Sequence, residues 1–235
     1  MKYLINYADL GFVESQKLNS SSGLSNGFDK VIAYNKNSID SDFLKNNKQI
    51  LDSRRGAGYW LWKPYIIHKT LNEVNENDIV FYSDSGVEFI KDMTPIFSKI
   101  KTVDRGVLIF RISGDHKEST WCRRNVAEQI VNCDKNIVES PQYCASFIGM
   151  RNCKESKNII SEWLSLCVQP LLIKDLPRQK KEFKNFRQHR HDQAILSLLA
   201  KKLKLETHID ISQWGGIHNT TTEDDIYVRH HRRRT

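Results

Sequence analysis

One segment of the sequence joins an apolar run to side chains that could bind a ligand or a metal ion. Residues 79–82 are apolar and predict a buried parallel strand, and Ser83-Asp84-Ser85-Gly86 follows them directly. Ligands of open α/β sheets bind just outside the carboxyl ends of the strands, so Asp84 is well placed to hold one. On this segment alone, a turn or helix cap made by Asp84 and Ser85 explains the residues equally well.

A second segment gathers cationic and aromatic side chains where a helix over residues 62–71 is expected to start. It reads Arg54-Arg55-Gly56-Ala57-Gly58-Tyr59-Trp60-Leu61-Trp62-Lys63-Pro64. Arg54, Arg55 and Lys63 could bind phosphate there, because the amide groups and dipole of a helix start also favour anions. Trp62 offers an apolar face for stacking, which a protein core uses equally well. The segment lacks the third glycine and the preceding strand of a dinucleotide fingerprint, so we exclude that type of site.

The composition is that of a folded protein with an excess of positive charge. The chain has 235 residues, 39% of them hydrophobic and 10% aromatic, which is enough for a core and argues against disorder. The formal net charge of +8 favours anionic partners, such as nucleotide phosphates, nucleic acid or an acidic membrane surface. Much of the excess lies in residues 178–191 and 229–234, and a solvated, flexible tail is the alternative explanation for the second stretch.

The cysteine content and the hydropathy pattern indicate the cellular compartment in which the protein is expected. The five cysteines form no Cys-x-x-Cys pair and are odd in number, so we expect free thiols rather than a zinc site or a disulfide framework. No apolar run approaches the ~18 residues that a membrane-spanning helix needs. Residues 1–7 become polar too soon for a signal peptide and are typical of a first strand. We therefore expect a cytoplasmic protein.

Strand-like and helix-like segments alternate along the chain, which predicts an α/β sandwich around a largely parallel sheet. The expected strands cover residues 2–7, 31–34, 79–82, 106–112, 142–150 and 205–209. The expected helices cover residues 41–51, 62–71, 93–100, 120–131, 157–168 and 194–200. Residues 19–27 are rich in Ser, Asn and Gly and predict a loop. We expect a single domain over residues 1–228, followed by a basic tail over residues 229–235.

Three motifs follow one another in an order that is more informative than any one of them. They are Gly58-Tyr59-Trp60-x-Trp62-Lys63-Pro64, Tyr82-Ser83-Asp84-Ser85-Gly86 and Arg190-His191-Asp192-Gln193. This order resembles that of the GT-A glycosyltransferases, especially the glycogenin-like members. It is also similar to small glycosyltransferases of bacterial polysaccharide clusters and large DNA viruses, over about residues 2–220. The resemblance implies a GT-A-like, Rossmann-type α/β/α sandwich and transfer of a sugar from a nucleotide-sugar, with UDP as the expected nucleotide.

The resemblance also implies a divalent cation, Mn²⁺ or Mg²⁺, at the end of the strand. The Asp-x-Asp motif of the family is here Asp84-Ser85-Gly86, so the second carboxylate is missing at its usual place. Glycogenin-like enzymes use a C-terminal histidine as a metal ligand, which makes His218 the candidate partner of Asp84. An ordinary loop histidine after two glycines is the alternative for His218.

The same resemblance suggests roles for the other motif residues. Asp192 is the candidate general base, or stabilises positive charge that develops on the sugar, because a helix start favours an ionised carboxylate. His191 is a second candidate base, and a plain N-cap role is the alternative for Asp192. The expected substrate-binding residues lie at strand ends and helix starts: Asn6, Tyr7, Arg54, Arg55, Trp62, Lys63, Asp84, Ser85 and Gln193.

The expected partners are a nucleotide-sugar donor and a glycan or lipid-linked glycan whose hydroxyl accepts the sugar. The basic tail could hold the protein near the inner face of an anionic membrane. Two other functions stay open: a nucleic-acid-binding protein that uses residues 178–191 and the tail, and an inactive relative that only binds sugar. Nucleic-acid binding predicts a steep salt dependence, but it leaves the three motifs unexplained.

Overall fold

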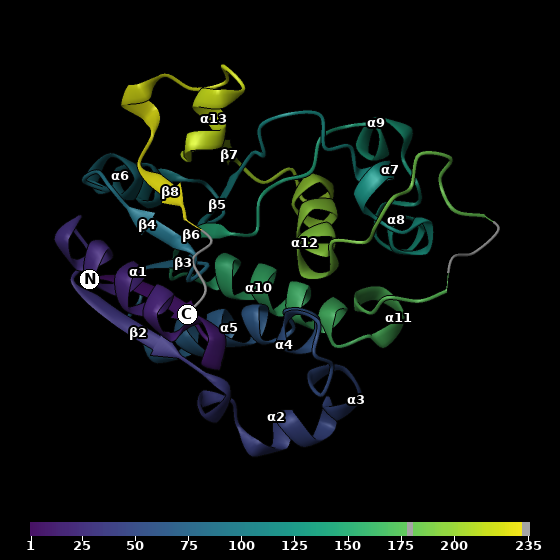
Figure 1. The fold of residues 1–235 in the computed structure, drawn as a ribbon, viewed down its shortest axis with the longest axis horizontal. Helices are drawn as coiled ribbons and strands as arrows, with labels where there is room; N and C mark the ends of the chain where they lie inside the picture. Colours follow the sequence, from purple (N-terminus) through teal and green to yellow (C-terminus); the bar gives the residue numbers. More distant parts are fainter. Residues whose placement is uncertain (178–180, 232–235) are drawn as a thin grey trace.

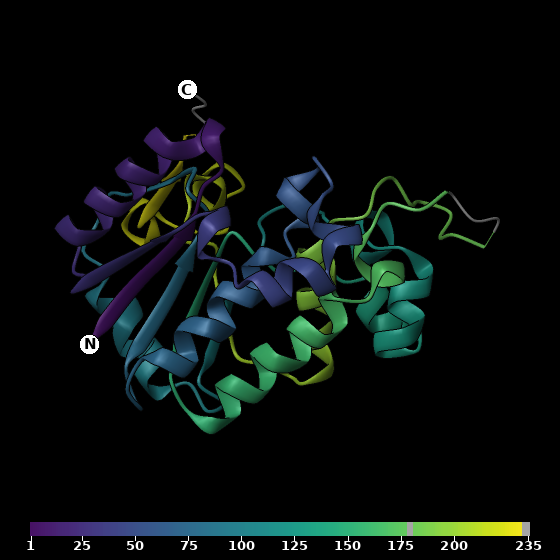
Figure 2. The same ribbon diagram turned by 90° about the horizontal axis from the view of Figure 1, so that it is seen from below.

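The computed structural model describes residues 1–177 and 181–231 and is built around a six-stranded sheet (Figures 1 and 2). The strands lie in the order β2-β1-β3-β6-β5-β7. All of them run in the same direction except β6, which is antiparallel to β3 and β5. The expected α/β class with a mostly parallel sheet is therefore confirmed. The strands are β1 Lys2–Tyr7, β2 Lys30–Tyr34, β3 Ile79–Ser83, β5 Val107–Phe110, β6 Phe147–Arg151 and β7 Thr207–His208.

Helices connect the strands, and a small second sheet pairs β4 Val87–Phe89 with β8 Val228–His230. The helices before β5 are α1 Val13–Ser25, α2 Ser41–Asn46, α3 Lys48–Leu51, α4 Gly56–Tyr59, α5 Trp62–Glu73 and α6 Thr94–Thr102. Those after β5 are α7 Glu118–Trp121, α8 Arg124–Val131, α9 Lys135–Val138, α10 Lys154–Cys167, α11 Pro170–Ile173, α12 His191–Lys202 and α13 Gln213–Ile217. Short 3-10 turns cover Leu10–Phe12, Lys36–Ser38 and Glu223–Asp225.

Both faces of the sheet are apolar, because successive residues of a strand point to opposite sides. On one face, residues such as Ile5 and Val80 pack with α5, α10 and α12. On the other, Leu4 and Phe81 pack with α6 and the small sheet. Figure 2 shows the resulting layers, with α1 on one side of the sheet and α5 and α10 on the other. This two-sided burial matches the near-continuous apolar strands of the sequence.

The direction of the strands determines where functional side chains can gather. The carboxyl ends of β1, β3, β5 and β7 meet at one edge of the sheet, because these four strands are parallel. Asp84 follows β3 at this edge. Since β6 is antiparallel, its start lies there as well, and the carbonyl of Ser146 accepts a 2.7 Å hydrogen bond from the amide of Asp84. We call this side of the molecule the carboxyl edge.

Helix α1 corrects the sequence prediction of a loop over residues 19–27. The helix continues to Ser25, and the residues that it turns towards the protein are Ser15, Asn19 and Gly23, spaced four apart. Gly23 allows close approach, because a Cβ at this position would lie 2.3 Å from the side chain of Leu4. A helix whose inner face is polar or lacks a side chain has no apolar periodicity, so the pattern does not predict it.

Asn19 takes the place of an apolar contact between α1 and the sheet. Its amide nitrogen donates to the hydroxyl of Ser83 at 3.0 Å and to the carbonyl of Val87 at 2.7 Å. Its oxygen accepts a 2.7 Å hydrogen bond from the amide of Asn6. Both asparagines are fully buried. Asn6 therefore holds α1 against β1.

Two predicted helices are divided, and the strands predicted over residues 106–112, 142–150 and 205–209 are shorter. Residues 41–51 form α2 and α3, and residues 118–131 form α7 and α8. Between α7 and α8 the backbone of Cys122 and Arg123 is extended, and the buried guanidinium of Arg123 bonds to the carbonyls of Leu176 and Pro177. The strand predicted over residues 142–150 starts only at β6. Before it, backbone and side-chain bonds alternate: the amide of Cys144 donates to the carbonyl of Phe110 at 2.7 Å, and the carbonyl of Ala145 accepts from Lys63 at 3.0 Å.

The predicted basic tail begins inside a strand, since Arg229 and His230 belong to β8 and pair with β4. Residues 232–235 of this tail and residues 178–180 of the other basic stretch lie outside the described residues. None of the helices in the described part of the chain has the length and apolar character needed to cross a membrane.

We expect Asn19→Ala to lower the free energy of unfolding by about 2 kcal/mol, because buried hydrogen-bonding groups on β1 and β3 lose their partner. The measurement is urea unfolding followed by circular dichroism. Ser21→Ala is the matched control, since this exposed serine of the same helix only bonds its own backbone. Equal stability of the two variants would contradict a polar attachment of α1.

Candidate active site

A cavity of about 1130 Å³ opens at the carboxyl edge. Its walls come from the ends of β1 and β3, the segment after β5, the α4 segment, the start of α12 and the loop after β7. Pockets for small ligands typically measure about 300–1,000 Å³. This cavity therefore has room for a large substrate or for two smaller ones.

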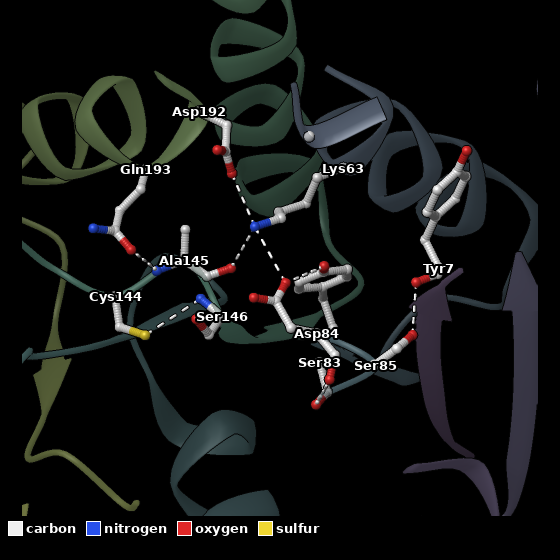
Figure 3. A network of polar contacts seen from close by, with 12 residues as sticks. Tyr7, Lys63, Ser83, Asp84, Ser85, Cys144, Ala145, Ser146, Asp192 and Gln193 are labelled. Carbon is white, nitrogen blue, oxygen red and sulfur yellow. Dashed lines mark hydrogen bonds and ion pairs between the residues drawn. The ribbon is translucent and has the colours of Figure 1, made fainter. Parts of the chain in front are cut away.

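Lys63 lies at the centre of the polar network on the cavity floor (Figure 3). Its ammonium lies 2.9 Å from the carboxylate of Asp192 and 3.3 Å from that of Asp84. It also donates to the carbonyl of Ala145 at 3.0 Å. The side chains of Lys63 and Asp192 are each 4% exposed, whereas that of Asp84 is 33% exposed. All three residues line the cavity, and Asp84 is the most exposed of them.

The two carboxylates keep the buried lysine charged. Burial alone lowers the pKa of Lys63, but the attraction of Asp192 and Asp84 outweighs it and raises the pKa above its ordinary value. Burial raises the pKa of Asp192 to about 6, and the ammonium of Lys63 limits this rise. The Oδ2 atom of Asp192 has no hydrogen-bond partner within the described residues, so its contact with Lys63 is an ion pair without good hydrogen-bond geometry.

The carboxylate of Asp84 has two unlike oxygens. Its Oδ1 atom accepts a hydrogen bond from the hydroxyl of Tyr82 and faces the ammonium of Lys63. Burial raises the pKa of the Tyr82 hydroxyl well above its ordinary value, and the charge of Asp84 adds to this, so the hydroxyl stays a donor. The Oδ2 atom is left for a ligand. The neighbouring Ser85 is buried, and its hydroxyl donates to the carbonyl of Tyr7 at 2.6 Å.

The cationic segment before α5 has a left-handed backbone. Five consecutive residues, from Gly56 to Trp60, have φ between 48° and 101°. Non-glycine residues in this region cost about 1–2 kcal/mol each. Gly58 is required here, because its φ is 101° and a Cβ would lie 2.7 Å from the Cα of Leu51. The turn places Arg54 on the cavity wall, where its exposed guanidinium forms no ion pair with any described residue.

The side chains of Arg55 and His191 are hydrogen-bonded to each other and do not extend into the cavity as free groups. The Nε of Arg55 donates to Nε2 of His191 at 2.8 Å and lies 3.1 Å from Asp175. Nδ1 of His191 lies 2.7 Å from the carbonyl of Ile173. Burial lowers the pKa of His191, so the ring is neutral, with Nδ1 donating and Nε2 accepting. Both nitrogens are engaged, and no lone pair is left to take a proton from a substrate in this arrangement.

Two of the expected substrate-binding residues, Tyr7 and Trp62, form a wall of the cavity. Tyr7 stacks on Trp62 with ring centroids 4.0 Å apart, and both line the cavity although each is only 6% exposed. Burial raises the pKa of Tyr7 to about 12, which keeps its hydroxyl protonated. Asn6, by contrast, is fully buried beneath α1 and is absent from the described lining of the cavity. The structure gives Asn6 a structural contact in place of the expected ligand contact.

Gln193 belongs to a polar chain that runs from the cavity into the core. Its amide nitrogen donates to Gln142 at 3.1 Å, and its oxygen accepts from the amide of Ala145 at 3.4 Å. Gln142 in turn donates to the fully buried Glu118 at 2.8 Å, and Glu118 pairs with Lys201 at 2.7 Å. The amide of Gln193 is therefore held in one orientation at the start of α12.

Comparison with solved structures identifies the architecture. The chain superposes on xyloside xylosyltransferase 1 from mouse with a TM-score of 0.52 at 10% identity, covering 98% of this chain and 97% of that one. A glycosyltransferase involved in glycosylation of the major capsid of PBCV-1 gives 0.51 at 11% identity, covering 99% and 94%. Glycosyltransferase GlyE of Streptococcus pneumoniae gives 0.52 at 12% identity, covering 97% of this chain and 54% of that one. The chain has a GT-A-like glycosyltransferase fold.

At these identities the likeness establishes the fold alone. No protein-family model and no curated protein sequence matches the chain. The roles of individual residues in this GT-A-like chain therefore rest on its own geometry.

The residues of the site do not fit a divalent cation held by the protein alone. Mg²⁺ takes six ligands in octahedral geometry and is usually held by one or two carboxylates together with waters and substrate phosphates, not by a cage of protein groups. Residues 1–177 and 181–231 contain no group of three or more His, Cys, Asp or Glu placed to hold a metal ion. Asp84 offers one oxygen, while the ammonium of Lys63 already faces the other. His218 lines the cavity beside Gly114. Binding of Mn²⁺ or Mg²⁺ to Asp84 and His218 stays a prediction.

Two features of the site were not predicted from the sequence. They are the pairing of the three charges and the series of hydrogen bonds from Gln193 through Gln142 to Glu118. The motifs present Lys63, Asp84 and Asp192 as separate residues with separate roles, and only the fold places one ammonium between the two carboxylates. Glu118 and Lys201 are 83 residues apart in sequence and carry no local signal. A buried strand-end residue such as Gln142 is a clue, since a polar side chain in an apolar segment needs a partner.

We expect Lys63→Met to destabilise the protein by about 3–5 kcal/mol at pH 8, because Asp192 becomes a buried charge without a counterion. Without Lys63 the pKa of Asp192 in the folded state rises further above its unfolded value, so the folded state binds more protons. The variant should therefore lose stability as pH rises from 5 to 8, and more steeply than the wild type.

Urea unfolding at the two pH values measures this effect. Lys69→Met is the matched control on the same helix, because Lys69 forms a solvent-exposed ion pair with Asp40. This substitution should lower the free energy of unfolding by about 1 kcal/mol or less. Similar losses for both variants, or a flat pH dependence of Lys63→Met, would contradict the assignment of Lys63 as the counterion of a buried carboxylate.

Proposed function

We propose that the protein is a glycosyltransferase that moves a sugar from a nucleoside-diphosphate sugar, with UDP as the nucleotide, to a hydroxyl of a glycan or lipid-linked glycan. One observation carries the proposal: a buried Lys63 between Asp84 and Asp192 lies on the floor of a large cavity at the carboxyl edge. In open α/β sheets this edge binds the ligand. The GT-A-like fold supports the same reaction class by analogy.

The nucleotide would lie over the ends of β1 and β3. Tyr7, backed by Trp62, offers an aromatic surface for the base. The free Oδ2 atom of Asp84 can accept hydrogen bonds from hydroxyls of the ribose or of the transferred sugar. Ser85 supports this wall through its bond to the Tyr7 backbone.

Transfer needs positive charge near the leaving diphosphate. Arg54 is suited to contact it, because its guanidinium is exposed on the cavity wall without an ion-pair partner in the described chain. Lys63 acts through Asp84, since its ammonium is buried and occupied by three acceptors. By offsetting the charge of Asp84 it allows a diphosphate to approach that carboxylate.

Asp192 provides a preorganised negative charge at the reaction centre. The triad contains two carboxylates and one ammonium, so its net charge is negative when both carboxylates are ionised. Such a charge stabilises the positive charge that develops on a sugar as its bond to the diphosphate breaks. Gln193, held by Gln142, would bind a substrate hydroxyl beside it. The roles of Asp192 and His191 as bases remain sequence predictions, and the engaged nitrogens of His191 favour a positioning role for that residue.

The residues present do not by themselves hold a divalent cation, so none of these roles depends on one. Mn²⁺ or Mg²⁺ at Asp84 and His218 remains part of the prediction from sequence. Contact of the basic tail with a membrane likewise stays a prediction, because residues 232–235 lie outside the described residues.

We expect UDP to raise the melting temperature and a panel of UDP-sugars to contain at least one that is hydrolysed or transferred. Asp84→Asn should lower kcat/KM about 100-fold or more, because a charge at the reaction centre is lost. Asp104→Asn is the control, because Asp104 is an exposed carboxylate before β5 that does not line the cavity, and it should leave kcat/KM unchanged. Absence of any thermal shift with millimolar nucleoside diphosphates would count decisively against the proposed donor.

We expect millimolar MnCl2 alone to leave the melting temperature unchanged, because Asp84 offers only one free oxygen beside an ammonium. Differential scanning fluorimetry with MnCl2, with UDP and with both separates a metal held by the protein from one that arrives with the nucleotide. A shift with MnCl2 alone that disappears in His218→Ala would restore the two-residue metal site predicted from sequence.

A further inference from the structure

Arg190 is a guanidinium without a counterion on the cavity wall. It directly precedes α12, and it stacks on the ring of Trp121 at 4.0 Å. Its side chain is half-buried and forms no hydrogen bond or ion pair within residues 1–177 and 181–231. Arginine carries five N–H donors in one plane. Those donors are left for the contents of the cavity.

Two histidines lie on the same wall. A Cβ on Gly114 would lie 3.4 Å from Nε2 of His218 and 3.7 Å from Nε2 of His116, so the two rings come together over this glycine. The ring of His116 also contacts Trp121 edge-on, with centroids 5.9 Å apart. Nδ1 of His116 is buried without a hydrogen-bond partner among the described residues. The wall therefore offers several nitrogen donors and an aromatic support.

The acidic groups near this wall do not neutralise Arg190. Asp115 is exposed and does not line the cavity. Asp210 also lines it, where neutral donors of Ser113 and Ser212 hold its two oxygens, and it forms no ion pair with Arg190 among the described residues. Glu118 is buried and paired with Lys201. Burial lowers the pKa of Arg190, and the nearby Glu118 offsets only part of this effect.

This wall lies away from Asp84. Trp121 and His116 follow β5, and His218 follows β7, whereas Asp84 follows β3. In the sheet, β6 separates β3 from β5, so the ends of β3 and β5 are two strand spacings, or about 10 Å, apart. The segments that carry His116 and His218 are thus separate from the one that carries Asp84, and we take a group bound between Arg190 and His116 as distinct from one at the Oδ2 atom of Asp84, which the titrations below test.

We propose that Arg190 and His116 form a subsite for an anionic group, a carboxylate or phosphate, carried by the acceptor. The planar guanidinium can bind such a group through two parallel hydrogen bonds, and Trp121 fixes the orientation of its plane. The proposal rests on the proposed function, because it names the class of acceptor: an acidic sugar or a phosphorylated glycan rather than a neutral one.

Ligand-detected nuclear magnetic resonance titrations test this subsite with glucuronate, glucose 1-phosphate and neutral glucose. Each ligand is titrated into the free protein and into the protein saturated with UDP. We expect both anionic ligands to bind in both states, and glucose to bind at least about tenfold more weakly. Arg190→Gln should raise the dissociation constants of the anionic ligands at least about tenfold and leave that of UDP unchanged.

Arg187→Gln is the matched control, because it removes the same charge from an exposed position three residues away. It should change none of the constants. Unchanged UDP binding by Arg190→Gln also shows that the variant is folded. If that variant does not fold, His116→Asn provides the second test and should weaken both anionic ligands but not UDP.

The outcomes separate the possible sources of the anion. Loss of anion binding in the presence of UDP, or weaker UDP binding by Arg190→Gln, would assign the wall to the diphosphate of the donor and overturn the proposal. Equal binding of glucose and glucuronate would overturn it as well. If UDP does not bind the wild type, the donor assignment fails, while loss of glucuronate binding in Arg190→Gln would still establish the anion subsite.

Discussion

The burial of one ammonium is the constraint on which the rest of the site depends. Lys63 is 4% exposed, and an unpaired charge in such a place costs several kcal/mol. The cost is offset only if Asp84, Asp192 and the carbonyl of Ala145 all converge on it. Lys63 itself lies on α5, and the three groups around it come from the end of β3, the start of α12 and the segment before β6. One ion cluster thereby fixes the relative positions of four segments that are distant in sequence.

A polar chain extends this cluster into the core. The backbone of Ala145 bonds both Lys63 and Gln193, and Gln193 is held by Gln142. Gln142 is in turn held by the buried Glu118. Each side chain of this series has a specific hydrogen-bond partner. The series therefore favours one arrangement of the side chains, whereas an apolar core would tolerate several arrangements. The strand predicted over residues 142–150 is regular only from Phe147. Before it, Cys144 still bonds Phe110 of β5, while the backbone of Ala145 bonds the side chains of Lys63 and Gln193.

The backbone is strained in two segments that line the cavity. Five consecutive residues with positive φ, from Gly56 to Trp60, turn the chain sharply before α5. His191 also has a positive φ, of 44°, at the start of α12. Strain of this kind persists only where surrounding contacts hold it. Here the bond from Arg55 to His191 joins the two strained segments across the cavity wall.

The α/β class, most strands, and the positions of Asp84, Lys63 and Asp192 at a strand end and at helix starts could be predicted from the amino-acid sequence. These follow from local patterns: apolar runs, glycines and the order of motifs. Helix α1 escaped prediction because Asn19 and Gly23 attach it to the sheet by hydrogen bonds and close approach instead of by an apolar stripe. Three features could be found only in the folded chain: Lys63 pairs with two carboxylates, both ring nitrogens of His191 are engaged, and Arg190 has no counterion among the described residues. Each of these depends on distances between residues far apart in the chain, and electrostatic effects follow distance and burial rather than sequence.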